Sequence, residues 1–182
     1  VKLCRNKLKI ISNRTYSDDS AKRESQIKAD LYAAIVEGQE GRPSVETSLH
    51  EIIPFKFVVH VHPTLVNGLL CSKNSASAVR EIFGNSVLYI EYTEPGYVLF
   101  KKTSEKISQF MAEQNKAPQL IFLENHGIFY CADSADEIIR LSDATESKIA
   151  VYLNCSLPQS GKPIDNKANL LLPAIRMMLT DN

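Results

Sequence analysis

Three histidines in this sequence are placed where they could bind one metal ion. His60 and His62 lie in an apolar run, residues 57–62, which predicts a β-strand. Residues two apart on a strand point to the same face, with about 6–7 Å between their backbones. His126, in the segment Glu-Asn-His-Gly, is the candidate third ligand. Three protein ligands that leave one position open are typical of a catalytic zinc ion.

Glu46 could supply a proton-transfer group beside that ion. A short helix predicted from Ser44 to about residue 53 places Glu46 and His50 on one face, because they are four residues apart. A carboxylate near a divalent metal can act as a base, and its pKa is raised by burial and lowered by the cation. The metal would act as a Lewis acid on a substrate carbonyl and stabilise an enediolate. Each pattern alone is commonly structural, so the prediction depends on their combination.

Helices and strands alternate along the chain, which predicts an α/β fold. The spacing of apolar residues, together with caps and breakers, predicts helices at 17–38, 44–53, 63–71, 74–83, 97–115 and 134–152, and strands at 57–62, 87–92, 119–124 and 127–131. The 97–115 helix is expected to bury Ile107, Phe110 and Met111. Residues 1–16 are basic and have no clear pattern, and residues 170–173 are expected to form a docked helix or loop.

Composition limits the classes of function. The 182 residues suit a single domain, and the 21 basic and 21 acidic residues cancel, which argues against a nucleic-acid partner bound by bulk charge. No apolar stretch approaches the ~20 residues that cross a membrane, so we expect no membrane partner. No signal peptide is visible, and the four cysteines are widely spread. These features predict reduced thiols and a cytoplasmic protein.

Three blocks of sequence closely resemble the class II aldolase/adducin family. They are the Arg-Pro-Ser-Val-Glu-Thr-Ser-Leu-His segment at 42–50, the Val-Val-His-Val-His-Pro segment at 58–63 and the Glu-Asn-His-Gly segment at 124–127. The loop at 91–97 is also similar, and the resemblance covers roughly residues 17–154. It implies a three-layer α-β-α sandwich, in which helices flank a central, mainly antiparallel sheet. It also implies a homo-oligomer, with a tetramer favoured and active sites at subunit boundaries.

The resemblance further implies a role for each site residue. His60, His62 and His126 would bind one Zn²⁺ per subunit, and Glu46 would be the catalytic base. The reaction would be the reversible retro-aldol cleavage of a ketose 1-phosphate to dihydroxyacetone phosphate and an aldehyde. His50 would support the site by packing, although the residues alone leave it open as a fourth ligand. Asn125 would support the turn that presents His126.

The sequence departs from the family pattern at two places. The Gly-Asn and Ser-Gly segments with which the family binds phosphate are not found, so we expect the single domain at 1–182 to lack part of the N-terminal phosphate-binding region. A sugar without phosphate therefore stays open as the substrate. The family's aldolases also use a tyrosine of a neighbouring subunit as general acid. Tyr89, Tyr92 and Tyr97 are the candidates here, and each could instead be a core aromatic residue.

Other activities share this type of metal site. Pentulose-phosphate epimerases of the family carry Asp at the position of Glu46, which counts against that reaction. A methylthioribulose-phosphate dehydratase has Glu followed by Thr, as in Glu46-Thr47 here, and stays an alternative. Adducin-like members are binding modules that have lost the metal ligands. Longer relatives with a similar sequence at 42–47 are fused to a short-chain dehydrogenase. No Gly-rich nucleotide-binding fingerprint occurs here, so we expect no such domain.

Overall fold

Two short, almost wholly apolar segments form the middle of the sheet. In the computed structural model, which describes residues 1–156, they are strands β3 (Leu120–Leu123) and β4 (Gly127–Ala132), and every residue in them is buried. The sheet has the order β1-β4-β3-β2, with β1 (Phe57–Val61) and β2 (Leu88–Ile90) on the outside. Strands β1 and β3 run antiparallel to β4, whereas β2 runs parallel to β3.

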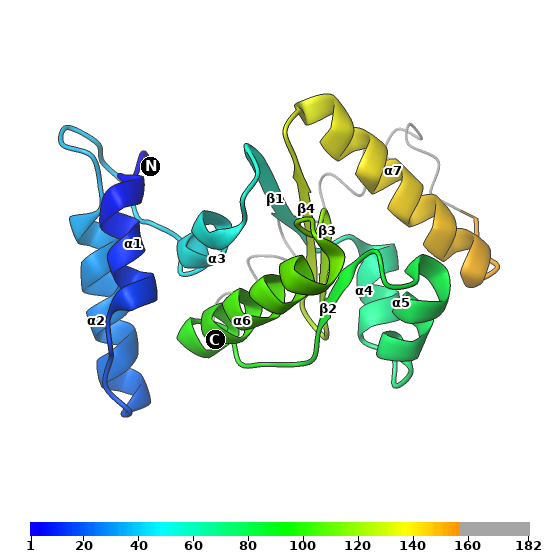
Figure 1. The fold of residues 1–182 in the computed structure, drawn as a ribbon, viewed down its shortest axis with the longest axis horizontal. Coiled ribbons are helices and arrows are strands. Elements are labelled where there is room, and N and C mark those ends of the chain that lie inside the picture. Colours follow the sequence, from blue (N-terminus) through cyan, green and yellow to red (C-terminus); the bar gives the residue numbers. More distant parts are fainter. Residues whose placement is uncertain (157–182) are drawn as a thin grey trace, which may run out of the picture.

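Helices cover both faces of this sheet (Figure 1). One face packs with α4 (Thr64–Leu70), α5 (Ser75–Phe83) and α7 (Ala135–Tyr152). The opposite face packs with α3 (Thr47–Ile52) and α6 (Tyr97–Gln114). Helices α1 (Arg5–Asn13) and α2 (Ser20–Ala33) lie beyond α3 and extend the same apolar core (Figure 1). Because side chains alternate along a strand, each apolar strand contributes side chains to the hydrophobic cores on both faces of the sheet. The predicted α/β sandwich with a mainly antiparallel sheet is therefore confirmed.

Local signals set the helix ends that matter most for this arrangement. The Asp19 side chain accepts a hydrogen bond from the backbone N–H of Lys22 and so caps α2. Ser134 accepts from the backbone N–H of Glu137 in the same way and caps α7. Helix α5 ends at Phe83 and is followed by Gly84, whose φ is +64°. The expected starts of α2 and α7 and the expected end of α5 are confirmed to within a few residues.

One helix was not predicted, and two expectations about the helices were wrong. Residues 1–16, which show no clear pattern in the sequence, contain α1, and this helix buries Leu8 and Ile11, which are three residues apart on one helix face. Helix α2 ends at Ala33 instead of continuing to Gly38. Met111 is 40% exposed, since it lies one residue beyond the buried Phe110 and therefore points about 100° away from it.

Residues 170–173 lie outside the described residues. Among the described helices, none combines the length and the apolar character needed to cross a bilayer.

Candidate metal centre

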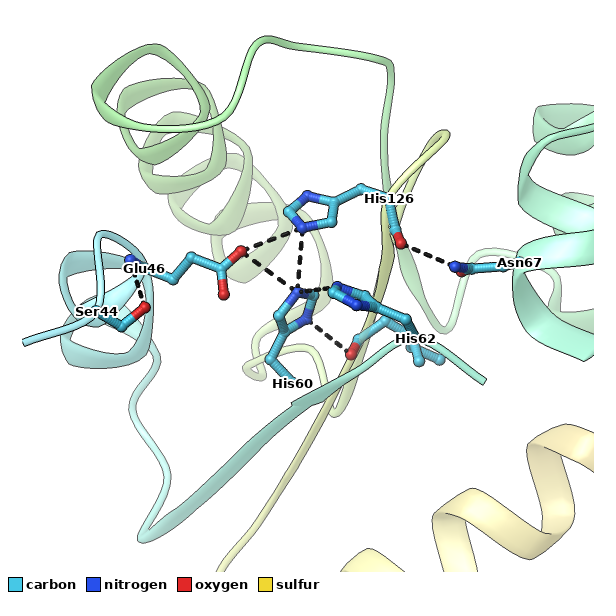
Figure 2. A network of polar contacts seen from close by, with 7 residues as sticks. Ser44, Glu46, His60, His62, Asn67 and His126 are labelled. Carbon is cyan, nitrogen blue, oxygen red and sulfur yellow. Dashed lines mark hydrogen bonds and ion pairs between the residues drawn. The ribbon is translucent and has the colours of Figure 1, made fainter. Parts of the chain in front are cut away.

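The three histidines converge at one end of the sheet. His60 lies in β1, His62 directly follows that strand, and His126 lies in the turn between β3 and β4. Because β1 pairs antiparallel with β4, the end of one strand meets the start of the other. The Nε2 atom of His60 is 3.0 Å from Nε2 of His62 and 3.4 Å from Nε2 of His126 (Figure 2). We call these three residues the histidine cluster, and their role as ligands stays a prediction.

The ring of His60 is held from two sides. Its Nδ1 atom is 3.1 Å from the backbone carbonyl oxygen of Ile128, to which it can donate a proton. Its ring also stacks on Phe129, with centroids 4.2 Å apart and planes 22° from parallel. A neutral imidazole with its proton on Nδ1 has its lone pair on Nε2. The hydrogen bond to the backbone of β4 therefore leaves the Nε2 lone pair of His60 directed towards the other two histidines.

Glu46 approaches the histidine cluster from α3. Its carboxylate Oε1 lies 3.1 Å from Nε2 of His126 and 3.5 Å from Nε2 of His60. The predicted helix start at Ser44 was wrong, because α3 begins at Thr47 and Glu46 is its N-cap residue. Ser44 instead accepts a hydrogen bond from the backbone N–H of Glu46 at 3.2 Å, which forms a tight turn before the helix.

The electrostatics of the centre favour an ionised Glu46 carboxylate and a neutral His126 ring. The hydrogen bond with His60 is the largest reason why the pKa of Glu46 lies below its usual value, and positive charge on all three rings adds to it, while burial opposes the shift. Burial is the largest reason why the pKa of His126 is lowered. Metal ligation requires neutral imidazole, so the environment of His126 suits that role.

Gly127 makes room for the histidine cluster, and its importance was not predicted. A Cβ atom at this position would lie 2.3 Å from Cδ2 of His62, 2.7 Å from the carbonyl oxygen of Val61 and 3.2 Å from Cε1 of His60. Ordinary carbon–carbon contacts are about 3.5–4.0 Å. Only glycine therefore fits beside the two rings as they are placed. The sequence signal was the glycine directly after His126, which a turn alone would also explain.

Two asparagines support the backbone around His126. Asn125 has a φ of +56°, a left-handed conformation that asparagine tolerates, and its backbone N–H donates to Leu70 at 3.3 Å. The side-chain amide of Asn67 in α4 donates to the carbonyl oxygen of His126 at 3.1 Å (Figure 2). Asn67 was not singled out from the sequence, because a polar residue on a short helix carries no signal for a contact 59 residues away.

Comparison with known proteins identifies the family of this chain. The family described as class II aldolase and adducin N-terminal domain matches residues 2–153. The chain belongs to this family.

Individual relatives are more distant. An uncharacterized oxidoreductase of Bacillus subtilis, YuxG, is 26% identical over 158 residues, which are 80% of this chain and 22% of that protein. The chain thus spans about a fifth of the length of this relative. The N-terminal class II aldolase domain of a conserved Thermoplasma acidophilum protein superposes with a TM-score of 0.64 at 23% identity, over 83% of this chain and 65% of that one. At this identity the match shows the fold alone. An L-fuculose 1-phosphate aldolase has a TM-score of 0.45 at 19% identity, over 78% of this chain and 67% of that one.

The donor set of this class II aldolase domain fits a divalent metal. Zinc bound by imidazole at about 2.0–2.1 Å in a tetrahedral arrangement needs neighbouring ligand atoms about 3.3 Å apart. The observed separations of 3.0 and 3.4 Å are close to that value, and the ligand atoms of the histidine cluster all lie within 4.8 Å of one another. Class II aldolases typically use a divalent metal, and these three side chains can hold one.

His50 lies beside the centre. Its ring contacts Phe129 edge-on, with centroids 5.3 Å apart, and so rests on the same ring that His60 stacks on. Burial is the largest cause of its lowered pKa, followed by the charge of His60. This packing agrees with a supporting role.

The three candidate tyrosines have different surroundings. The Tyr89 hydroxyl is hydrogen-bonded to Ser75 at 2.7 Å, and burial raises its pKa. The Tyr97 ring packs edge-on against Tyr16, with centroids 5.1 Å apart. Tyr92 is 59% exposed in the loop between β2 and α6. In the described part of the chain, none of the three hydroxyls is hydrogen-bonded to Glu46 or to the histidine cluster.

Proposed function

We propose that this chain is a zinc-dependent aldehyde-lyase domain. It would cleave a ketose 1-phosphate reversibly to dihydroxyacetone phosphate and an aldehyde. The observation that carries the proposal is the meeting of three imidazole rings with one carboxylate. Nε2 of His60 lies 3.0 Å from Nε2 of His62 and 3.4 Å from Nε2 of His126, and Oε1 of Glu46 lies 3.1 Å from Nε2 of His126 and 3.5 Å from Nε2 of His60. Membership of the class II aldolase family supports the same chemistry.

Each side chain of the centre has a distinct part in this proposal. His60, His62 and His126 would hold the zinc ion, which when bound would act as a Lewis acid on the carbonyl oxygen of the substrate. Glu46 would accept and return the proton at the substrate carbon that becomes nucleophilic. Since its pKa is lowered, its carboxylate is ionised at neutral pH and ready to accept that proton.

Of the three tyrosines, we propose Tyr92 as the general acid. Its side chain is exposed, whereas the hydroxyl of Tyr89 and the ring of Tyr97 already have partners within the chain. An exposed phenol can reach a substrate in its own subunit or in a neighbouring one. We therefore propose that the domain works as a homo-oligomer, with a tetramer favoured. Sedimentation analysis of the purified chain tests the oligomeric state.

The Glu46→Gln variant tests the proposed base. It should keep its zinc, measured by elemental analysis, and lose about 10²–10⁴-fold in turnover, because a positioned base typically contributes that much. The control is Glu40→Gln, which removes an exposed carboxylate and should leave turnover unchanged. An unchanged rate in Glu46→Gln would remove this residue from the mechanism.

A panel of ketose 1-phosphates separates the alternatives. Release of dihydroxyacetone phosphate, detected with a coupled reductase, supports the lyase. Loss of water from a methylthioribulose-type substrate without that product would support the dehydratase instead. Inversion at one carbon would support the epimerase. A zinc content below about a tenth of an equivalent per chain after reconstitution would favour a non-catalytic binding module, because the proposed reaction requires a bound metal ion.

A further inference from the structure

Glu124 links the turn that presents His126 to the loop that carries Tyr92. It directly follows β3 and stands two residues before His126. Its carboxylate Oε2 accepts a hydrogen bond from the backbone N–H of Tyr92 at 2.7 Å. This distance lies at the short end of the range for N–H···O bonds, as is typical of a carboxylate acceptor. In the described part of the chain, no hydrogen bond joins this carboxylate to the histidine cluster, so its position indicates a role in holding the loop.

The topology of the sheet brings these two segments together. Because β2 runs parallel to β3, both strands end at the end of the sheet where the histidine cluster lies. The last pair of this ladder is Ile90 with Leu123, and the backbone N–H of Glu124 donates to the carbonyl oxygen of Ile90 at 2.9 Å. The side chain of Glu124 then extends the contact past the end of β2, to Tyr92. One residue therefore fixes the start of the loop twice, through its backbone and through its side chain.

The other oxygen of the Glu124 carboxylate faces a buried hydroxyl group. Oε1 is 3.5 Å from Oγ of Ser75, at the outer limit of a hydrogen bond. Ser75, the first residue of α5, is 1% exposed, and its Oγ lies 2.7 Å from the hydroxyl oxygen of Tyr89. Glu124 is itself half-buried. Its carboxylate therefore has protein groups beside both oxygens, which hold it in one orientation.

The loop at 91–96 is attached more weakly on its other side. The carboxylate of Glu91 lies 3.2 Å from Nζ of Lys102 and 3.7 Å from Nζ of Lys106, both in α6, and such exposed ion pairs contribute little. The side chain of Tyr92 is 59% exposed, so its backbone is held while its phenol is free to reach a substrate. A reacting group needs this kind of support, because its rate depends steeply on its distance from the substrate.

We infer that Glu124 is a positioning residue for Tyr92. Its carboxylate holds the backbone of Tyr92 beside the His126 turn, so that the phenol is presented at the metal end of the sheet. The catalytic part of this inference rests on the proposed function, in which Tyr92 is the general acid. The hydrogen bond between Glu124 and Tyr92 does not depend on that function and can be tested without substrate.

Two variants of nearly equal size separate the acceptor oxygen from the bulk of the side chain. Glu124→Gln keeps an oxygen that can accept from Tyr92, whereas Glu124→Met keeps the length and loses the strong acceptor. Hydrogen exchange of the Tyr92 amide, followed by nuclear magnetic resonance of the full chain, should become at least ~10-fold faster in Glu124→Met. It should become only about 3-fold faster in Glu124→Gln, because a neutral acceptor is weaker than a charged one. The control Glu94→Gln removes an exposed carboxylate of the same loop and should match the wild type.

Turnover of the zinc-loaded chain tests the catalytic part. With a ketose 1-phosphate as substrate, Glu124→Met should lower kcat about 10–100-fold at wild-type zinc content, because a small misplacement of a reacting group costs that much. Glu124→Gln should recover most of this loss. Tyr92→Phe should lower kcat about 10²–10⁴-fold. In the Tyr92→Phe background, Glu124→Met should cost less than ~2-fold more, since the group that it positions is absent.

The outcomes separate the inference from the proposed function. Wild-type exchange of the Tyr92 amide in Glu124→Met overturns the inference, and so does an equal loss of kcat on adding Glu124→Met to the wild type and to Tyr92→Phe. A wild-type rate in Tyr92→Phe excludes the general acid and, with it, the catalytic part of the inference. If the chain cleaves no ketose 1-phosphate, the proposed function fails, and amide exchange alone decides the inference. Circular dichroism checks folding, and Glu124→Ala takes the place of Glu124→Met in both assays if that variant does not fold.

Discussion

Replacing Gly127 with alanine tests whether the histidine cluster is built as tightly as the structure indicates. The added methyl group would lie 2.3 Å from Cδ2 of His62 and 2.7 Å from the carbonyl oxygen of Val61. To regain a carbon–carbon contact of about 3.5 Å, the ring of His62 must retreat by ~1.2 Å. The carbonyl of Val61 cannot retreat freely, because Val61 is paired with Ile128 in the β1–β4 ladder.

Both metal affinity and stability should therefore fall. Protein ligands must lie within ~0.2 Å of their ideal distance from the metal, so a shift of ~1 Å removes His62 from the site. We expect zinc affinity to fall at least ~100-fold. Removing a hydrogen-bond partner of a metal ligand costs about 10–100-fold, and displacing the ligand itself should cost at least as much. The strain of overpacking should lower the free energy of unfolding by about 1–3 kcal/mol.

Two measurements on the same variant check this reasoning. Competition with a chromophoric chelator gives the zinc affinity, and urea unfolding of the metal-free protein gives the free energy of unfolding. The matched control is Gly68→Ala in α4, where an added Cβ has no neighbour within 4 Å. It should leave zinc binding unchanged and raise stability by about 0.5–1 kcal/mol, because alanine is the better helix former. Wild-type zinc affinity together with a wild-type urea midpoint in Gly127→Ala would refute the proposed crowding.

Three further variants extend the test. His62→Ala should weaken zinc binding at least ~100-fold, measured by chelator competition. It should change the metal-free free energy of unfolding by less than ~0.5 kcal/mol, because the ring is exposed. Retained zinc would exclude His62 as a ligand. Asn67→Ala removes the donor to the His126 carbonyl and should cost ~1 kcal/mol in urea unfolding and ~10–100-fold in zinc affinity; no change in either would show that the contact is incidental. The folded-state pKa of His50 is lowered from 6.5, so the unfolded chain gains protons first as the pH falls and stability drops below about pH 6.5. His50→Gln should reduce the slope of the free energy of unfolding against pH, measured by urea unfolding of the metal-free protein from about pH 8 to pH 5. Part of the slope should remain, because the pKa of His126 is also lowered. An unaltered slope would contradict this role of His50.

Several features of the fold follow from short-range patterns. The start of α7 depends on Ser134 and Glu137, which are three residues apart and form their hydrogen bond within one turn. Leu8 and Ile11 carry the same kind of helical spacing, but α1 was missed because basic residues surround them. The shared face of His60 and His62 follows from the alternation of a strand and needs no knowledge of the partner strand.

The sequence by itself determined the element types, the family and the pair of histidines on one strand face, because these depend on residues close together in the chain. Tertiary structure alone decided that α3 brings Glu46 to 3.1 Å from His126, that Asn67 supports a carbonyl 59 residues away and that Gly127 leaves room for two imidazole rings. Such contacts depend on how helices and strands pack across the two cores. The spacing of residues along a short segment of sequence does not determine these distances.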